Sequence, residues 1–394
     1  MKKLLVFLSI FVSLNASVLK ESELERIKKE KEKSSLEAKL LKDSWINPIN
    51  ISGDISKNKT SNMTSSTKRV YLDIDQDIFR SGGIFYTIQK AKEQNNLSQQ
   101  IYAHELDTKE TEALKLVLSI NKIDLQIKKQ DYIIKNKKIE IVKKEEEYLN
   151  GTTSIEELDN AVIEKNELEN EIEDFKISKY NLLREFKNYS STSYKKIVPI
   201  KLELISLENF LKTNRTLIIN KLNSSISKYE KEITSSNYLP KISLFSQFGY
   251  EHNNRLNNDK NFYNYGLKIT IPLDYNMNKN KEMAKVNYRL SKIEENQKKE
   301  EEINSFQSIF KSLENIERKI ENGKSTINSY ENIYSLTKDL VAGFIKTKED
   351  LKTIENRLSS SKLDIKILEI DKQLLIYDIN KNSRSEVFTL LTLD

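Results

Sequence analysis

Two long segments of the chain carry an apolar residue at every seventh position. A strict seven-residue repeat keeps these side chains on one helix face and imposes a left-handed supercoil on helices that share it. The sequence therefore predicts two long coiled-coil helices. The first repeat consists of Leu106, Ala113, Ile120, Ile127, Ile134, Ile141 and Tyr148, and the second of Phe306, Leu313, Ile320, Ile327, Tyr334 and Val341.

A glycine follows each repeat and predicts where the long helix ends. Gly151 and Gly343 stand just past the last apolar position, which is a common place for a helix to stop. Ser154 and Thr347 come next and have side chains suited to cap a following helix. Each long helix is thus expected to turn back at its glycine. The two predicted helical hairpins span about residues 84–187 and 281–381.

Two shorter segments alternate apolar and polar residues with the period of a β-strand. In the stretch 263–273 the apolar face is formed by Tyr263, Tyr265, Leu267, Ile269, Ile271 and Leu273. Upstream, Leu72, Ile74 and Ile78 match Leu267, Ile269 and Leu273 at a constant offset of 195 positions. This offset indicates an internal repeat. The predicted strands cover about 45–56, 69–79, 240–251 and 262–274, and the predicted repeats cover 17–205 and 206–394.

Composition agrees with a mainly α-helical fold that has a small β part. The 394 residues include 8 glycines and 4 prolines, and 31% are charged, as is typical of long helices. The 65 basic and 59 acidic side chains are spread along the chain, so nucleic-acid binding is not indicated. With 2 histidines, no cysteine and no phosphate-binding glycine loop, we expect no enzyme activity, no cofactor and no metal site.

The N-terminus has the features of a secretory signal peptide. Lys2 and Lys3 precede an apolar run from Leu4 to Leu14, and small residues around Ala16 follow. The run is too short for the ~20 residues that a membrane-spanning helix needs, and no later segment reaches that length. We therefore predict export, with residues 1–16 as the signal peptide and cleavage after Ala16 or Ser17.

The predicted strands are suited to a membrane β-barrel, since about 10 residues per strand can cross a bilayer. An open sheet edge is not tolerated in lipid, and four strands from one chain cannot close a barrel. The strands thus predict a cyclic assembly of several copies. The expected lipid-facing residues are Leu72, Ile74, Leu267, Ile269 and Ile271, and the expected lumen-facing residues are Asp73, Asp75 and Lys268.

The order of these segments resembles the outer membrane efflux protein family, the TolC-like channels. The local matches are GLKITIPLD at 266–274, LDIDQDIFRSGG at 72–83, YLP at 238–240, and the two glycine-containing segments YLNGTTSIEELDNAVIEKNEL and LVAGFIKTKEDLKTIENRL. The resemblance covers nearly the whole chain after the signal peptide. Two departures are Asp77, where the family often has proline, and a short N-terminal helix from Leu19 to Ser44.

The resemblance implies a homotrimer in the outer membrane of a Gram-negative bacterium. Its twelve strands would form one barrel, continued by an α-helical tunnel in the periplasm. The helical tips would dock on a periplasmic adaptor coupled to an inner-membrane pump, as in a tripartite efflux pump or a type I secretion system. Such a channel is a passive duct. The tip residues implicated are Gly151, Thr152, Thr153, Gly343, Phe344, Ile345 and Thr347.

The resemblance also implies a periplasmic gate formed by acidic residues just beyond the second tip glycine. Asp350 lies at the matching distance from Gly343, while Thr353 occupies the position where some members have a second acid. An ordinary reading of Asp350 is a carboxylate at a helix start, which the helix dipole favours.

Two other classes of protein remain open on the sequence. A periplasmic adaptor also contains a coiled-coil hairpin, although usually one hairpin between small β-domains. A secreted structural coiled coil would explain the seven-residue repeats but not four amphipathic strands. A soluble sandwich could likewise use the strand faces, since alternation shows only that one face is dry.

Overall fold

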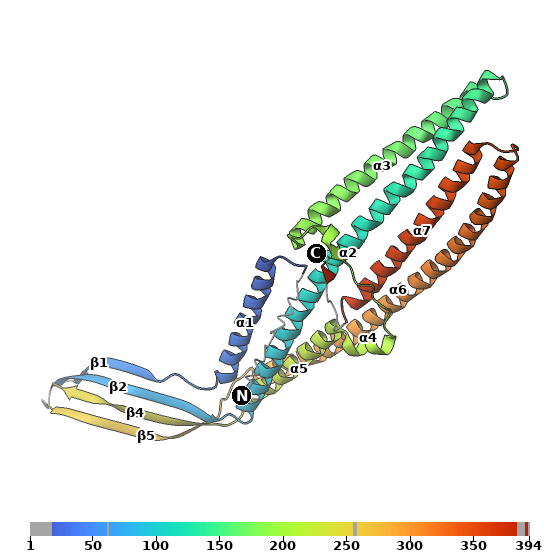
Figure 1. The fold of residues 1–394 in the computed structure, drawn as a ribbon. Coiled ribbons are helices and arrows are strands. Elements are labelled where there is room, and N and C mark those ends of the chain that lie inside the picture. Colours follow the sequence, from blue (N-terminus) through green and yellow to red (C-terminus); the bar gives the residue numbers. More distant parts are fainter. Residues whose placement is uncertain (1–17, 61–62, 255–257, 384–390, 393–394) are drawn as a thin grey trace, which may run out of the picture. The chain divides into compact units, whose positions relative to one another are not determined.

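The computed structural model describes residues 18–60, 63–254, 258–383 and 391–392. The predicted signal peptide, residues 1–16, lies outside the described residues. The chain divides into two compact units (Figure 1). The sheet unit comprises the described residues within Arg26–Ala103 and Arg215–Glu301, and the hairpin unit comprises those within Met1–Glu25, His104–Asn214 and Glu302–Asp394.

The sheet unit contains a four-stranded antiparallel sheet with the strand order β1-β2-β4-β5. The strands are β1 (Asn50–Thr60), β2 (Met63–Phe79), β4 (Lys241–Asn253) and β5 (Asn258–Thr270). In this sheet β1 and β5 are the edge strands, each paired on one side among the described residues.

The hairpins of the sheet extend further at their turns than the sequence predicts. The predicted strands leave residues 57–68 and 252–261 outside the sheet, yet Thr60 pairs with Met63 and Asn253 with Asn258. In these segments Asn, Ser, Thr and Lys occupy both faces of the sheet. The alternation of apolar and polar residues therefore ends before the backbone pairing ends.

The hairpin unit is built from long antiparallel helices. The helix α2 (Gly83–Leu149) turns back into α3 (Ile155–Tyr189), and α6 (Met277–Ala342) turns back into α7 (Lys348–Asn380) (Figure 1). Residues of α1 (Glu21–Asp43), α2 and α6 belong to both units. Shorter elements of the hairpin unit are α4 (Leu207–Thr213), the 3-10 turn η1 (Tyr194–Lys196), and the strand β3 (Ile197–Val198), which pairs with β6 (Leu391–Thr392). The helix α5 (Arg215–Ser236) belongs to the sheet unit.

Residues of both seven-residue repeats lie in the core of the hairpin unit, whereas Tyr148 at the end of the first repeat is exposed. Ala113 and Ile120 of the first repeat are completely buried, in a cluster with Val117 and Tyr377. Phe306 and Leu313 of the second repeat pack in another cluster, around Phe210. The mainly helical fold with a small sheet is thereby confirmed. None of the described helices combines the length and the apolar character that a membrane crossing demands.

Candidate functional site

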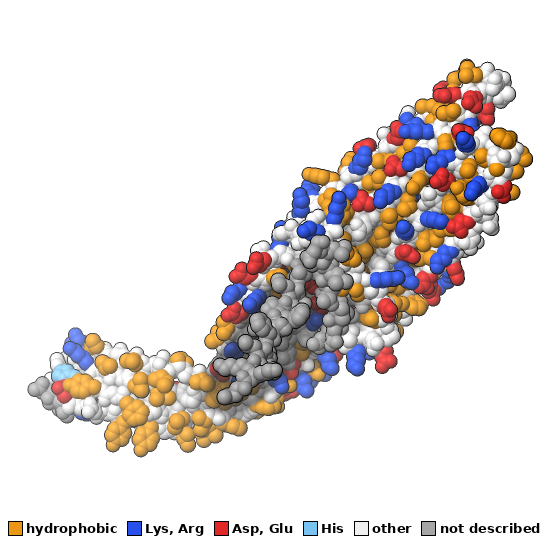
Figure 2. Space-filling view, in the orientation of Figure 1, with side chains coloured by type: hydrophobic (Ala, Val, Ile, Leu, Met, Phe, Trp, Pro, Cys, Tyr) orange, Lys and Arg blue, Asp and Glu red, His pale blue; other side chains and the backbone are white. Residues whose placement is uncertain are grey.

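The sheet has one apolar face and one polar face. Ile51, Leu72, Phe248 and Tyr263 lie directly opposite one another in a row across all four strands. Since directly opposite residues point to the same side of a sheet, this row marks the apolar face. Figure 2 shows hydrophobic side chains gathered over the strands. The residues predicted to face lipid lie on this face within the strands, namely Leu72, Ile74, Leu267 and Ile269, and Ile271 follows directly after β5.

The polar face carries the three residues predicted to face a lumen. Asp73 and Asp75 alternate with Leu72 and Ile74 along β2, and Lys268 is opposite Ser243 of β4. The Asp73 carboxylate accepts a hydrogen bond from Gln247 Nε2 at 2.9 Å. Two aromatic side chains, Tyr71 and Phe262, also lie on this face with ring centroids 6.1 Å apart. These two rings were not predicted from the sequence.

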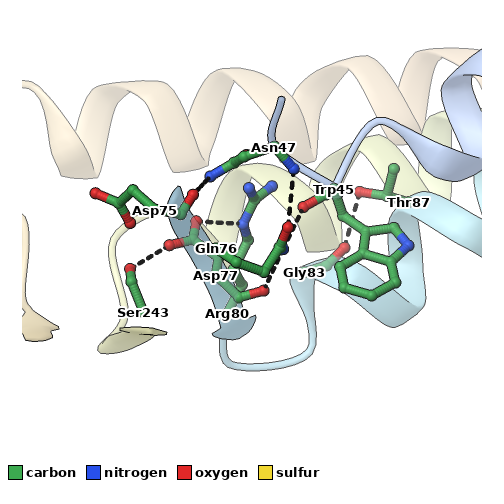
Figure 3. A network of polar contacts seen from close by, with 9 residues as sticks. All are labelled: Trp45, Asn47, Asp75, Gln76, Asp77, Arg80, Gly83, Thr87 and Ser243. Carbon is green, nitrogen blue, oxygen red and sulfur yellow. Dashed lines mark hydrogen bonds and ion pairs between the residues drawn. The ribbon is translucent and has the colours of Figure 1, made fainter. Parts of the chain in front are cut away.

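A polar network ties the end of β2 to its neighbours (Figure 3). The Asp77 carboxylate is buried, accepts a hydrogen bond from the Ser243 hydroxyl, and forms an ion pair of 2.6 Å with Arg80 Nε. The Gln76 amide donates to the Trp45 carbonyl and accepts from the Asn47 backbone N–H, both at 3.0 Å. Asp77 therefore links β2, β4 and the turn that leads into α2, at a position where a proline would offer none of these contacts.

Both helical tips use the same backbone motif, with different residues in its left-handed position. At the first tip, Gly151 has φ +71°, and Thr152 N–H donates to the Glu147 carbonyl at 2.9 Å. At the second tip, the left-handed residue is Phe344 with φ +59°, and Ile345 N–H donates to the Leu340 carbonyl at 2.9 Å. The bend thus falls on the predicted glycine at the first tip and one residue after Gly343 at the second.

The predicted residues of the first tip are polar, although Leu149 beside them is exposed, and those of the second tip include two large apolar side chains. The hydroxyls of Thr152 and Thr153 donate to the Glu147 carbonyl and the Glu157 carboxylate, at 2.9 and 2.8 Å. Phe344 is 97% exposed and Ile345 is also exposed, so within one chain neither side chain is covered. Large exposed apolar side chains at one place commonly mark an interaction surface.

Asp350 has two partners at the start of α7. It completes a capping box with Thr347, because each residue's backbone N–H donates to the other's side chain at 3.1 Å. Its Oδ1 also lies 2.5 Å from Lys143 Nζ on α2. The hydrogen bond from Lys143, followed by the one from Thr347, lowers the pKa of the Asp350 carboxyl below its usual value.

The pair of Lys143 and Asp350 is the last of a regular series between α2 and α7, which we name the Lys–Asp ladder. Its pairs recur every seven residues on both helices: Lys115–Asp378 at 2.8 Å, Lys122–Asp371 at 2.6 Å, Lys129–Asp364 at 2.7 Å and Lys143–Asp350 at 2.5 Å. These two helices belong to different hairpins. The ladder therefore joins the first helical hairpin to the second along their shared side.

The ladder is interrupted once, by amides. Asn136 occupies the α2 position where the next lysine would stand, and its Oδ1 accepts a hydrogen bond of 2.8 Å from Asn356 Nδ2. Asn136 Nδ2 in turn donates to the Thr353 carbonyl at 3.2 Å. Asn356 is 1% exposed. The ladder and its break were not predicted. Lysines spaced seven residues apart lie on one helix face, but the spacing does not indicate which helix carries their acidic partners.

A second set of charged contacts joins α2 to α3 within the first hairpin. Lys144 Nζ lies 2.7 Å from Glu157 and Lys137 Nζ lies 2.6 Å from Glu164, again seven residues apart. Burial lowers the pKa of Lys137, but its hydrogen bonds to Glu140 and Glu164 outweigh this effect and hold that pKa above its usual value. The helix α2 is thus flanked by one charged row toward α3 and another toward α7.

Comparison with known proteins gives matches among solved structures only. No protein-family model and no curated protein matches the chain. The outer membrane channel CmeC of Campylobacter jejuni is 16% identical, with 93% of this chain and 84% of that chain covered and a TM-score of 0.73. The outer membrane protein VceC of Vibrio cholerae is 13% identical, with 92% and 94% covered and a TM-score of 0.70. The channel-forming protein CusC is 12% identical, with 93% and 89% covered and a TM-score of 0.70.

Proposed function

We propose that this chain, whose fold is that of the TolC-like outer membrane channels, is the outer-membrane component of a tripartite efflux pump or a type I secretion system. Its location would be the outer membrane of a Gram-negative bacterium, with the helical hairpins in the periplasm. The observation that carries the proposal is the sheet with two different faces and two free edges.

The free edges require partner copies if the sheet lies in lipid. Each unpaired backbone group would cost several kcal/mol in hydrocarbon, so the sheet must close on itself. Three copies of the four strands supply twelve strands, enough for a barrel around an aqueous lumen. In that barrel the face with Leu72 contacts lipid and the face with Asp73 lines the lumen. The assembly is accordingly a homotrimer.

The helical tips are the proposed docking sites for the periplasmic adaptor. The support is the exposure of Phe344 and Ile345, which no part of the same chain covers among the described residues. Gly151, Thr152, Thr153, Gly343 and Thr347 surround the two turns and would contribute backbone and hydroxyl contacts. Through the adaptor the duct would connect to an inner-membrane pump.

Asp350 is the proposed gate residue, in combination with Lys143. Their 2.5 Å pair attaches the first turn of α7 to α2, which belongs to the other hairpin. Separation of the second tip from the first requires this pair to break. The capping box of Asp350 with Thr347 is internal to the second tip and persists in either position. The helix-cap role and the gate role are therefore compatible.

The duct itself performs no chemical step in this proposal. Its only histidines are His104 and His252, and it has no cysteine. Within the described part of the chain, no three His, Cys, Asp or Glu side chains come together as a metal site would require. Selection of the exported substrate then lies with the pump, while charges such as Asp73 and Lys268 bias the passage of ions.

Cell fractionation and mass determination test the proposal. Outer membranes from cells that produce the chain are extracted with detergent, and the mass of the purified particle is measured. A trimeric particle in the outer-membrane fraction is the expected result. A soluble monomer in the periplasm would contradict the channel and would favour a coiled-coil adaptor instead.

A further inference from the structure

Two aromatic side chains meet over a glycine on the polar face of the sheet. Tyr71 of β2 and Phe262 of β5 are both directly opposite Gly249 of β4. Their backbones are two strand spacings apart, about 9.6 Å, yet their ring centroids are 6.1 Å apart. The rings therefore lean toward each other above the glycine. A Cβ on Gly249 would lie 2.5 Å from Tyr71 Cβ, so glycine leaves the room that the ring pair uses.

A third ring lies on the same face, four residues nearer the start of β4. Phe245 is directly opposite Gly266 of β5, and a Cβ on that glycine would lie 2.9 Å from the Phe245 ring. The ring therefore covers a place on β5 where no side chain stands. Four residues correspond to about 13 Å along a strand, which separates this ring from the ring pair. We name the partly exposed side chains of Tyr71, Phe245 and Phe262 the aromatic cluster.

The charged side chains between the ring pair and the third ring are both negative. Asp73 and Asp75 follow Tyr71 along β2 at intervals of two residues, so all three point to the polar face. Asp75 is directly opposite Phe245, and the directly opposite neighbours of Asp73 are uncharged amides. Within the described strands, neither of these two rows across the sheet contains a lysine or an arginine. The interval between the rings is therefore negative.

The neighbouring basic side chains on this face lie outside that interval. Arg69 precedes Tyr71 by two residues, and its Nε lies 3.4 Å from the Asp54 carboxylate and 3.9 Å from that of Glu251. Its charge is thus offset by two acidic neighbours. Lys268 is opposite Ser243, one row beyond the third ring. The polar face therefore holds a negative interval with aromatic rings at both ends.

We propose that the aromatic cluster, together with Asp73 and Asp75, binds an organic cation with an aromatic body on the wall of the duct. The rings contact the aromatic body and attract its positive charge through cation–π interaction, and the carboxylates supply the opposite charge. This inference rests on the proposed function, in which the polar face lines the lumen, and adds a class of solute that the wall itself retains. The site lies on β2, β4 and β5 of one chain, so it does not depend on how neighbouring copies meet.

A solute with both an aromatic body and a positive charge uses every part of this site. The face of an aromatic ring carries partial negative charge, so rings and carboxylates alike attract a cation and repel an anion. A small hydrated cation meets the carboxylates but makes little contact with the rings. A neutral aromatic solute meets the rings but leaves the carboxylates without a counter-charge.

Block of the channel current in planar bilayers tests the inference. The full-length chain is purified and inserted, and tetraphenylphosphonium is expected to reduce the current as its concentration rises. Tetramethylammonium, a cation without rings, and tetraphenylborate, an anion with four rings, should each need at least about tenfold more for the same block. Equal block by either of these two ions, or no block by tetraphenylphosphonium, would overturn the proposed ligand class. A chain that forms no channel would overturn the proposed function instead.

Matched variants assign the block to these side chains. Tyr71→Leu/Phe262→Leu removes two rings but keeps apolar side chains, and Asp73→Asn/Asp75→Asn removes the charges but keeps the shape. Each double variant should raise the half-blocking concentration of tetraphenylphosphonium at least about fivefold. Tyr263→Leu removes the adjacent ring on the opposite face of β5 and should leave the block unchanged.

The charge variant decides the question if the ring variant fails to assemble, because asparagine retains the shape of aspartate. Block that persists unchanged in the double variants that form channels would overturn the site. Block that Tyr263→Leu weakens to the same extent would also overturn it, since that side chain lies on the apolar face.

Discussion

At the residue scale, Phe344 has a backbone conformation that does not suit its side chain. Its φ of +59° is in the left-handed region, which costs residues other than glycine roughly 1–2 kcal/mol. Because the side chain is almost fully exposed, little apolar burial within the chain offsets this cost. A strained backbone at an exposed turn points to a function for the side chain, which agrees with the proposed docking role.

Replacement of Phe344 by glycine should therefore stabilise the protein. We expect Phe344→Gly to raise the free energy of unfolding by about 1 kcal/mol in thermal denaturation, because glycine adopts the left-handed region without strain. The matched control is Gly151→Ala at the first tip, which places a Cβ at φ +71° and should destabilise by a similar amount. An unchanged or lowered stability of Phe344→Gly would show that the turn is not strained. Loss of efflux in this more stable variant would assign the side chain to docking.

The stabilising effect of Asp350 should depend on pH in a defined direction. Its pKa is lowered in the folded protein, so its contribution is fully present above the pKa of the unfolded chain, about 3.9. The contribution is lost as pH falls through the still lower pKa of the folded state. We expect Asp350→Asn to be less stable than the wild type at neutral pH, by about 1 kcal/mol or less because the pair is partly exposed. The melting temperatures of both proteins should begin to converge as pH falls below about 4 and should meet only below the lowered pKa of the folded state. A constant difference through that range would refute the ionic contribution.

At the scale of elements, the Lys–Asp ladder should tolerate an exchange of its charges. Lys122→Asp places two carboxylates together opposite position 371 and should lower the melting temperature, although one partly exposed pair contributes only about 1 kcal/mol or less. The double variant Lys122→Asp/Asp371→Lys restores opposite charges and should recover most of the loss. As a control, Lys311→Asp reverses an exposed lysine whose partner lies on the same helix and should have a smaller effect. A double variant as unstable as the single one would show that the two helices are held by their core alone.

Elements that bury one face were predictable from the sequence, while contacts between elements were not. The seven-residue repeats predict α2 and α6 because core side chains must return to one helix face. The ladder was not predictable, since the spacing of Lys115, Lys122 and Lys129 fits any neighbouring helix. The left-handed turn at Phe344 was missed because glycine is the usual residue there. The alignment of Asp54, Arg69, Glu251 and Lys260 across the four strands was not predictable either, because it depends on the strand register.

At the scale of the whole molecule, the two faces of the sheet should respond differently to added charge. Leu72 and Asp73 are neighbours on β2 and point to opposite faces. Arginine on a lipid-facing position costs about 2–4 kcal/mol near the bilayer midplane, whereas a lumenal substitution leaves the barrel intact. We therefore expect Leu72→Arg to reduce the amount of trimer in the outer membrane severely, as measured by heat-modifiable migration on gels.

Asp73→Lys, at the adjacent position, should assemble normally and change conduction. In the proposed barrel it replaces a negative lumenal side chain by a positive one in every copy, so the reversal potential in planar bilayers should shift toward anion selectivity. The substitution also removes the hydrogen bond from Gln247, whose loss from a water-filled lumen should be small because water can replace it. Normal assembly of Leu72→Arg together with failed assembly of Asp73→Lys would mean that the sheet faces are reversed. Equal tolerance of both variants would mean that neither face contacts lipid.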